Sequence, residues 1–285
     1  MTSGSSDLAV PPVARDVAVV GHKVIGAKHV RDGRPCQDDL CIERGGSAIA
    51  LAVADGHGSS VHAEIGARIA VQVTTRALLD FATSLGIGHR ADLRAVHGFA
   101  QDPFRRQLVR EWVREVQEYA GTDDIDLKDY GSTLLFALVT PDFLLLGQLG
   151  DGDLLMVASD GTVFRPIPTD PVCFGEETSS LCLPEASTSL RVLAMPVPRG
   201  ETLLLVSTDG YGKSYATDVN FERIGPDYLQ MVREIGMSGV AENLEGFLTT
   251  VTTGGSGDDI ALGLVYFPPG AADPSDTQDS PGDSA

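Results

Sequence analysis

Four aspartates in this chain lie at the ends of apolar segments, where a charged side chain is costly unless it has a partner. Asp55 ends the run LAVA, and Asp209 follows the run LLLVST. Asp258 comes just before the run IALGLVYF, and Asp38 lies in the short segment QDDL. A fifth aspartate, Asp151, follows LLLGQLG. If these segments are neighbouring strands of one pair of sheets, the carboxylates converge at one end of it.

Such a group of carboxylates predicts a site for divalent cations. Several carboxylates in one place cannot all stay ionised without a nearby positive charge. Ligands that are all oxygen favour Mg²⁺ or Mn²⁺ over zinc, and Gly56 and Gly210 would let the backbone approach the ions. Two such ions can activate a water and clamp a transferring oxygen centre, so phosphate-ester hydrolysis is the natural chemistry. For any single Asp-Gly pair, an ordinary hairpin turn is the competing interpretation.

The elements that must position these aspartates follow from the hydrophobic pattern. Helices are expected over 62–81, 103–119, 226–235 and 240–251, with Pro103 in a first turn. Strands are expected over 17–25, 47–54, 132–139, 143–149, 154–158, 162–164, 190–194, 202–207 and 260–267. Of these, we expect 190–194 and 202–207 to form a pair. Groups of strands separated by helices predict an α+β fold, a β-sandwich of two mainly antiparallel sheets.

The 285 residues are expected to form one folded domain, 17–267, between two disordered tails, 1–16 and 268–285. The formal net charge of −19 predicts a surface that repels nucleic acid and anionic membranes. The sequence has no apolar run of 18 residues and no secretory signal, so a cytoplasmic location is expected. The spacing of its four cysteines fits no common zinc site, which predicts free thiols.

Six short motifs, in order, resemble those of the metal-dependent protein phosphatases of type 2C, and most of all the bacterial branch of that family. They are CQD (36–38), VADGHG (53–58), YGST (130–133), LGDG (149–152), VSTDGY (206–211) and GDDI (257–260). Together they span roughly residues 20–266, which is nearly the whole expected domain.

The resemblance implies a fold of two packed β-sheets flanked by α-helices, with a site for two Mn²⁺ or Mg²⁺ ions at one edge. It also implies the removal of phosphate from phosphoserine and phosphothreonine proteins. In this family a metal-activated water attacks phosphorus in line and no covalent phosphoenzyme forms. The expected partner is therefore a phosphorylated protein, the product of a serine/threonine kinase.

The resemblance also assigns roles to residues. Asp55 matches the carboxylate that bridges both metals, and the carbonyl of Gly56 matches a ligand of the second metal. Asp209 and Asp258 match ligands of the first metal, and Asp38 matches an acidic position near the second, often acting through water. His57 matches the general acid for the leaving oxygen; without these neighbours it would be taken for a surface histidine in a turn.

The chain departs from the family pattern at several positions. Gln37 stands where many relatives have glutamate, and Gly33 where several have a phosphate-binding arginine, for which Arg34 (or Arg31) is the substitute here. Asp151 matches a ligand of the third metal in three-metal relatives. In those relatives a second aspartate, four residues after the match of Asp209, also binds the third metal. The residue at that position here is Lys213, whose positive charge argues against a third ion. Asp259 stands where relatives often have asparagine, and it would tune the site or cap a turn.

Three functions are compatible with these observations. The leading one is an active serine/threonine phosphoprotein phosphatase. The alternative is a catalytically weak phosphatase-like module that regulates or binds a phosphoprotein, which Gln37, Gly33 and Lys213 favour. The third is a metal-dependent hydrolase of another phosphoester.

Overall fold

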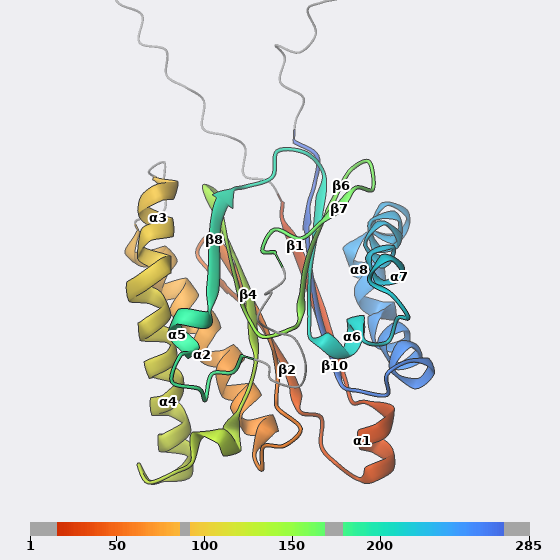
Figure 1. The fold of residues 1–285 in the computed structure, drawn as a ribbon. Coiled ribbons are helices and arrows are strands. Elements are labelled where there is room, and N and C mark those ends of the chain that lie inside the picture. Colours follow the sequence, from red (N-terminus) through yellow and green to blue (C-terminus); the bar gives the residue numbers. More distant parts are fainter. Residues whose placement is uncertain (1–15, 86–91, 169–178, 271–285) are drawn as a thin grey trace, which may run out of the picture.

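Two five-stranded antiparallel sheets face each other in the centre of the molecule (Figure 1). The computed structural model describes residues 16–85, 92–168 and 179–270. The first sheet has the order β1-β10-β9-β6-β7. Its strands are β1 (Ala18–Val24), β10 (Ile260–Phe267), β9 (Thr202–Ser207), β6 (Asp153–Ala158) and β7 (Val163–Phe164). The second sheet has the order β2-β3-β4-β5-β8. Its strands are β2 (Asp38–Gly45), β3 (Ala48–Asp55), β4 (Leu134–Val139), β5 (Phe143–Leu149) and β8 (Arg191–Pro196).

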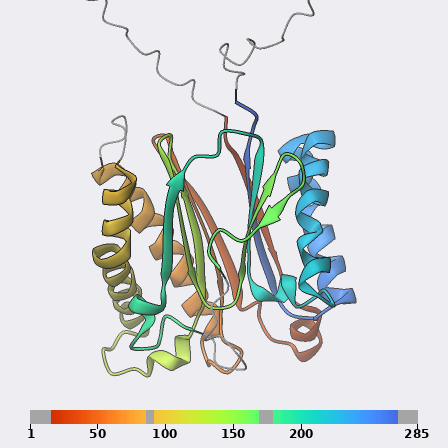
Figure 2. The ribbon, with the colours of Figure 1, turned by 45° about the horizontal axis from the view of Figure 1, so that its top comes forward.

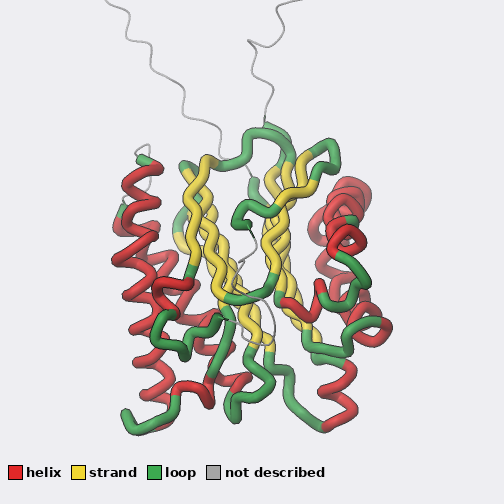
Figure 3. Tube along the Cα trace, viewed as in Figure 1, coloured by secondary structure: helices red, strands yellow, loops and turns green. Residues whose placement is uncertain are grey.

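Helices cover the outer face of each sheet, as Figures 2 and 3 show. The helices on the side of the second sheet are α2 (Ala63–Ser84), α3 (Leu93–Phe99), α4 (Arg105–Ala120) and the short α5 (Ala186–Ser189). Those on the side of the first sheet are α6 (Asp209–Gly212), α7 (Asp218–Glu222) and α8 (Ile224–Gly254). The short helix α1 (Ala27–Asp32) joins β1 to β2 at one end of the sandwich (Figure 1). The α+β sandwich predicted from the sequence is therefore confirmed.

The core has three parts, which explains why the central strands are continuous apolar runs. One hydrophobic cluster lies between the second sheet and its helices, another between the first sheet and α8, and a third between the two sheets. A strand covered on both faces must be apolar at every position rather than at every second one. All seven residues of β5 are buried, and so are the first seven of β3, where only the terminal Asp55 is half-buried.

Two expectations about local structure are wrong. The strands over 190–194 and 202–207 do not pair, because β8 pairs with β5 and β9 lies in the other sheet between β10 and β6. Strands that follow each other in sequence need not be neighbours, and here the chain crosses from one sheet to the other. Pro103 does not start a helix either: it lies inside a π-helical turn (Ala100–Phe104) that joins α3 to α4.

The pattern predicted most elements but joined or missed some of them. The expected helices over 226–235 and 240–251 are two parts of α8, which is interrupted at Gly236 (φ 69°). Strand β2 and helix α1 were not predicted, although both contribute to the site described below. Cys173 and most of both predicted tails lie outside the described residues. In the described part of the chain, no helix combines the length and the apolar character that crossing a membrane requires.

Candidate functional site

The four aspartates singled out in the sequence lie at the same end of the sandwich. Asp38 begins β2 and Asp55 ends the antiparallel strand β3, so the two are direct partners in the ladder. In the other sheet, Asp209 follows the end of β9 and Asp258 precedes the start of β10, and these two strands are also antiparallel neighbours. Because antiparallel strands alternate in direction, the end of one and the start of the next meet at one edge. The convergence expected from the sequence is present.

Two threonines hold the Asp38–Asp55 pair in place. The Thr208 hydroxyl donates to Oδ2 of Asp38 at 2.5 Å and accepts from the backbone N–H of Ala261 at 2.9 Å. The Thr133 hydroxyl accepts from the backbone N–H of Asp55 at 3.0 Å. Thr208 directly follows β9 of the first sheet, and Asp38 begins β2 of the second sheet. The hydrogen bond between Thr208 and Asp38 therefore joins the two sheets at the site.

Three of these aspartates, Asp55, Asp209 and Asp258, line a pocket of about 350 Å³ together with charged groups of both signs, whereas Asp38 is buried and is not among the described lining residues. Among the described residues that line it, six are aspartates: Asp32, Asp55, Asp151, Asp209, Asp258 and Asp259. Three of its lining residues are cationic: Lys28, Arg34 and Lys213. Gly56 and His57 also line it. An anionic ligand would therefore meet cations on part of the pocket wall and could approach the carboxylates only if a cation lay between them.

Crowding of the carboxylates changes their acidity. Burial raises the pKa of Asp38 well above its ordinary value; the Thr208 hydrogen bond opposes this, and the charges of Asp259 and Asp209 add to it. Burial also raises the pKa of Asp55 strongly, helped by the charges of Asp38 and Asp209. For Asp209, burial and the charge of Asp151 raise the pKa to about 6, although Lys213 acts in the opposite direction. In the metal-free protein these groups cannot all ionise easily at neutral pH.

This donor set fits hard divalent cations. The four aspartates offer carboxylate oxygens, and the Gly56 carbonyl would add a further oxygen. Burial together with like charge makes a cation the natural partner of these groups. Within the described residues, however, no three His, Cys, Asp or Glu side chains already stand around one point as a metal would require. Asp38 accepts a hydrogen bond from Thr208, and Asp209 pairs with Lys213.

Lys213 occupies the edge of the pocket at which the third metal was considered. Its ammonium group pairs with Oδ2 of Asp209 and lies 3.8 Å from Oδ2 of Asp151. The pairing follows from sequence spacing, since Lys213 comes four residues after Asp209, one turn along α6 and its C-cap. A fixed positive charge therefore already stands between the two carboxylates.

His57 lies in the pocket wall with an unused ring nitrogen. Its Nε2 is buried and has no hydrogen-bond partner among the described residues. Its backbone N–H donates to the carbonyl of Gly131 at 2.9 Å, which fixes the residue in the turn after β3. Burial lowers the pKa of His57, while the charge of Asp151 raises it. A buried nitrogen with no partner suggests that this ring contacts a ligand.

Arg34 is the arginine that the structure places in the pocket. Its Nη2 donates to Oε1 of Gln37 at 3.1 Å and to the carbonyl of Gly58 at 3.0 Å. Nε and Nη1 have no partner among the described residues, so part of the guanidinium fork is available to an anion. Arg31 instead points to its neighbour Asp32 and is not part of the pocket lining.

Cys36, next to Gln37 and Asp38 in the chain, is a poor candidate for chemistry. Burial raises the pKa of its thiol to about 12, and the charges of Asp259 and Asp38 contribute. Because the thiolate is the reactive form, this thiol is unreactive at neutral pH. Cys36, Cys41 and Cys182 are free, as expected for those three.

Gly56 and Gly210 also allow close packing of the backbone. A Cβ at Gly56 would lie 2.4 Å from the carbonyl oxygen of Ala63, and a Cβ at Gly210 would lie 2.0 Å from that of Asp259. Both glycines therefore allow two segments of backbone to pack closely beneath the pocket. Gly210 brings the start of α6 against the loop before β10 and so brings Asp209 near Asp258.

Several pocket residues were missed by the sequence analysis. Lys28 and His29 line the pocket from α1, a helix that the pattern did not predict. Thr208, directly before Asp209, was quoted only as part of a motif. Asp259 was considered as a cap or a tuning charge, yet it accepts three hydrogen bonds from the α1 region. Of these residues, only Asp259 could have been singled out from the sequence, because it is a second carboxylate next to Asp258.

The chain matches the family model described as "Protein phosphatase 2C" over residues 25–249. Among solved structures, it is similar to the serine/threonine phosphatase of S. agalactiae, with a TM-score of 0.61 and 14% identity, over 88% of this chain and 99% of that one. It is also similar to a bacterial serine phosphatase, with a TM-score of 0.58 and 15% identity, over 90% of this chain and 100% of that one. Identities this low establish a shared fold.

A third similar structure contains the RsbU and RsbW domains of a Mycobacterium tuberculosis protein. Its TM-score is 0.52 at 15% identity, and the match covers 91% of this chain and 64% of that one. The comparison with curated proteins gives no significant match. The family model and the fold agree with each other.

Proposed function

This chain belongs to the protein phosphatase 2C family, and we propose that it is a metal-dependent phosphatase that removes phosphate from phosphoserine and phosphothreonine in proteins. The observation that best supports the proposal is the ladder pair Asp38–Asp55 at the end of the sandwich where Asp55, Asp209 and Asp258 line one pocket. Such a group of like charges favours a cation, and the family is metal-dependent. The proposed phosphatase domain spans 17–267.

The proposed roles follow from position in the pocket. Asp38, Asp55, Asp209, Asp258 and the carbonyl of Gly56 would hold two Mn²⁺ or Mg²⁺ ions. Once bound, the ions would make a water more acidic and stabilise negative charge on the phosphoryl group. The chain's other groups would act on the substrate.

Arg34 and His57 would serve the substrate directly. The free side of the Arg34 guanidinium would bind a phosphoryl oxygen and orient the group. Nε2 of His57 would give a proton to the serine or threonine oxygen as it leaves. Since burial lowers the pKa of His57, the charge of Asp151 nearby would help it to stay protonated for this step.

The first test measures phosphate release from a phosphothreonine peptide with Mn²⁺, with Mg²⁺ and with excess chelator. Release that needs the metal supports the proposal. The same assay with a nucleotide and with a small phosphate monoester as substrate distinguishes a protein phosphatase from another phosphoester hydrolase. No release by the folded protein with either metal would instead favour a phosphoprotein-binding module, the function suggested by Gln37, Gly33 and the Lys213–Asp209 pair.

Replacing His57 with glutamine is expected to slow a phosphothreonine peptide by about 100-fold and p-nitrophenyl phosphate by less than about fivefold. A general acid matters most when the departing oxygen is basic, and nitrophenolate leaves without help. The measurement is kcat for both substrates at saturating metal. His22→Gln is the control, since His22 lies near Glu245 and outside the pocket. Equal losses on both substrates would contradict the acid role.

Replacing Lys213 with aspartate is expected to raise the number of Mn²⁺ ions bound per chain from two to three. The ammonium group now stands between Asp209 and Asp151, and a third carboxylate there would attract a cation instead. Equilibrium dialysis followed by metal analysis counts the ions without relying on activity. Lys213→Arg keeps the charge and should keep two ions. Three ions in the wild-type protein would refute the proposed role of Lys213.

A further inference from the structure

One side of the pocket is formed by a single segment, residues 26–37, called here the α1 wall. It comprises Gly26, helix α1 and the loop that leads to β2. Two of the three cations in the pocket lining, Lys28 and Arg34, belong to it. A helix of six residues has little stability of its own, so the wall depends on contacts to the rest of the molecule.

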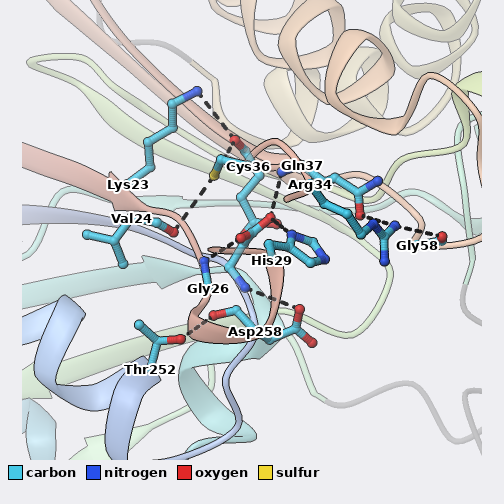
Figure 4. Close-up of polar contacts among 12 residues, drawn as sticks. Lys23, Val24, Gly26, His29, Arg34, Cys36, Gln37, Gly58, Thr252 and Asp258 are labelled. Atoms are coloured by element: carbon cyan, nitrogen blue, oxygen red, sulfur yellow. Dashed lines mark hydrogen bonds and ion pairs between the residues drawn. The ribbon is translucent and has the colours of Figure 1, made fainter. Parts of the chain in front are cut away.

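The side chain of Asp259 holds this wall at three points. Its Oδ1 accepts from the backbone N–H of Gly26 at 2.5 Å. Its Oδ2 accepts from the backbone N–H of Gln37 at 2.6 Å and from Nδ1 of His29 at 2.8 Å. Figure 4 shows these contacts meeting between Gly26, His29 and Gln37. One carboxylate thus binds the start, the middle and the end of the α1 wall.

Both members of the Asp259–His29 pair are buried, at 3% and 7% exposure. The carboxylate accepts from three donors that all belong to the wall, which leaves it poorly placed to act as a metal ligand. Asp258, its neighbour in the chain, also lines the pocket, but its carboxylate accepts only one hydrogen bond among the described residues, at 3.2 Å from the backbone N–H of Asp259. The carboxylate that departs from the family pattern at Asp259 is thus used to hold the α1 wall.

The proposed metal ligands Asp38 and Asp258 have anchors that do not involve the side chain of Asp259. Asp38 is held by Thr208 and by its ladder partner Asp55. The backbone of Asp258 is held by Thr252, whose hydroxyl donates to its carbonyl at 2.7 Å, and by Ser256, whose hydroxyl accepts from its N–H at 3.2 Å. Loss of the Asp259–His29 contacts would loosen the wall more than the metal ligands.

We propose that Asp259 and His29 form a positioning pair for substrate binding, which fixes the α1 wall so that Lys28 and Arg34 face the phosphate. This inference rests on the proposed phosphatase function and adds a determinant of substrate affinity to it. A chain with a net charge of −19 and six aspartates in the pocket repels an anionic substrate unless cations are held in a defined place. The pair supplies that placement without contacting the substrate.

The test uses variants that remove or keep the donors and acceptors. Asp259→Asn replaces one carboxylate oxygen with an amide N–H group, which then faces the donors of the wall instead of accepting from them. His29→Leu removes the Nδ1 donor and keeps a side chain of similar volume. His29→Asn keeps a donor close to the place of Nδ1. Arg31→Gln is the matched control on the same helix, because Arg31 is exposed and its partner is the neighbouring Asp32.

The kinetic readout separates substrate binding from metal binding and chemistry. With a phosphothreonine peptide at saturating Mn²⁺, Asp259→Asn and His29→Leu are expected to raise KM about tenfold, as the loss of a buried hydrogen bond implies. In His29→Leu, kcat and the Mn²⁺ concentration for half activation stay within about threefold. His29→Asn and Arg31→Gln keep KM within about threefold. An unchanged KM in both Asp259→Asn and His29→Leu overturns the proposal.

A second readout is independent of catalysis. Hydrogen exchange of the Gly26 and Gln37 amides is expected to be about tenfold faster in Asp259→Asn than in the wild type, because both amides lose their acceptor or face a donor. The Val53 amide in β3 should not change. If the wild type releases no phosphate but these two amides respond, the phosphatase proposal fails and the positioning of the wall by Asp259 stands. If they do not respond, the positioning pair is refuted, whatever the activity.

Discussion

Replacing Asp55 with asparagine is expected to lower phosphate release by at least about 1000-fold while raising the melting temperature of the metal-free protein by a few degrees. Asp55 is the proposed ligand of both ions, and metal-ion stabilisation of the transferring group is worth several kcal/mol, at 1.36 kcal/mol for each factor of ten. Stability is expected to rise although activity falls, because Asp55 is a half-buried carboxylate whose pKa is raised by burial and by the charges of Asp38 and Asp209. Asparagine keeps its shape and removes one of the repelling charges.

The measurement pairs kcat at saturating Mn²⁺ with thermal unfolding in excess chelator at pH 7.5. Asp39→Asn is the control, since Asp39 lies on the same strand as Asp38 but pairs with Lys23 at the surface, at 2.8 Å. It should keep activity within about twofold. Normal activity in Asp55→Asn would refute the proposed site. A lower melting temperature of metal-free Asp55→Asn would refute the view that repulsion between carboxylates destabilises the metal-free protein.

The metal-free protein is expected to lose stability as the pH rises from about 4 to 7, and added Mn²⁺ is expected to restore it at neutral pH. An aspartate whose pKa is higher in the folded chain binds more protons when folded. Its contribution to stability is therefore present at low pH and is lost as the pH rises through the folded pKa. For Asp209 that pKa is about 6, and Asp38 and Asp55 shift in the same direction.

The pKa of Asp209 alone gives the expected size of this loss of stability. A difference of about two pKa units between the folded and unfolded chain corresponds to about 3 kcal/mol, or about 5–10 °C in melting temperature for a domain of this size. Thermal unfolding in chelator at pH 4.5, 6 and 7.5 measures it, and Asp209→Asn should flatten the profile. Mn²⁺ should raise the melting temperature more at pH 7.5 than at pH 4.5, since protons compete with the ion. A profile that is the same in wild type and Asp209→Asn would contradict this account.

Most of the fold could be predicted because its main elements are long and strongly patterned. The largely apolar runs of β3, β5 and β9 are typical of buried strands, and α2 shows helical spacing over its whole length. Sheet pairing was less predictable. The chain passes from β8 in one sheet to β9 in the other, and two neighbouring apolar segments carry no local mark of which sheet each will join.

The sequence by itself determined which carboxylates end or precede the buried strands, and so which residues could share a site: Asp38, Asp55, Asp209 and Asp258. Their types and places follow from local pattern, because a charge beside an apolar run is informative without knowledge of the fold. Only the tertiary structure decided the partners of these groups. Asp259 holds Gly26, His29 and Gln37 across more than two hundred residues, and Thr208 reaches Asp38 from the opposite sheet. Such contacts depend on how two sheets and a short helix pack, and sequence spacing records no distance between segments so far apart.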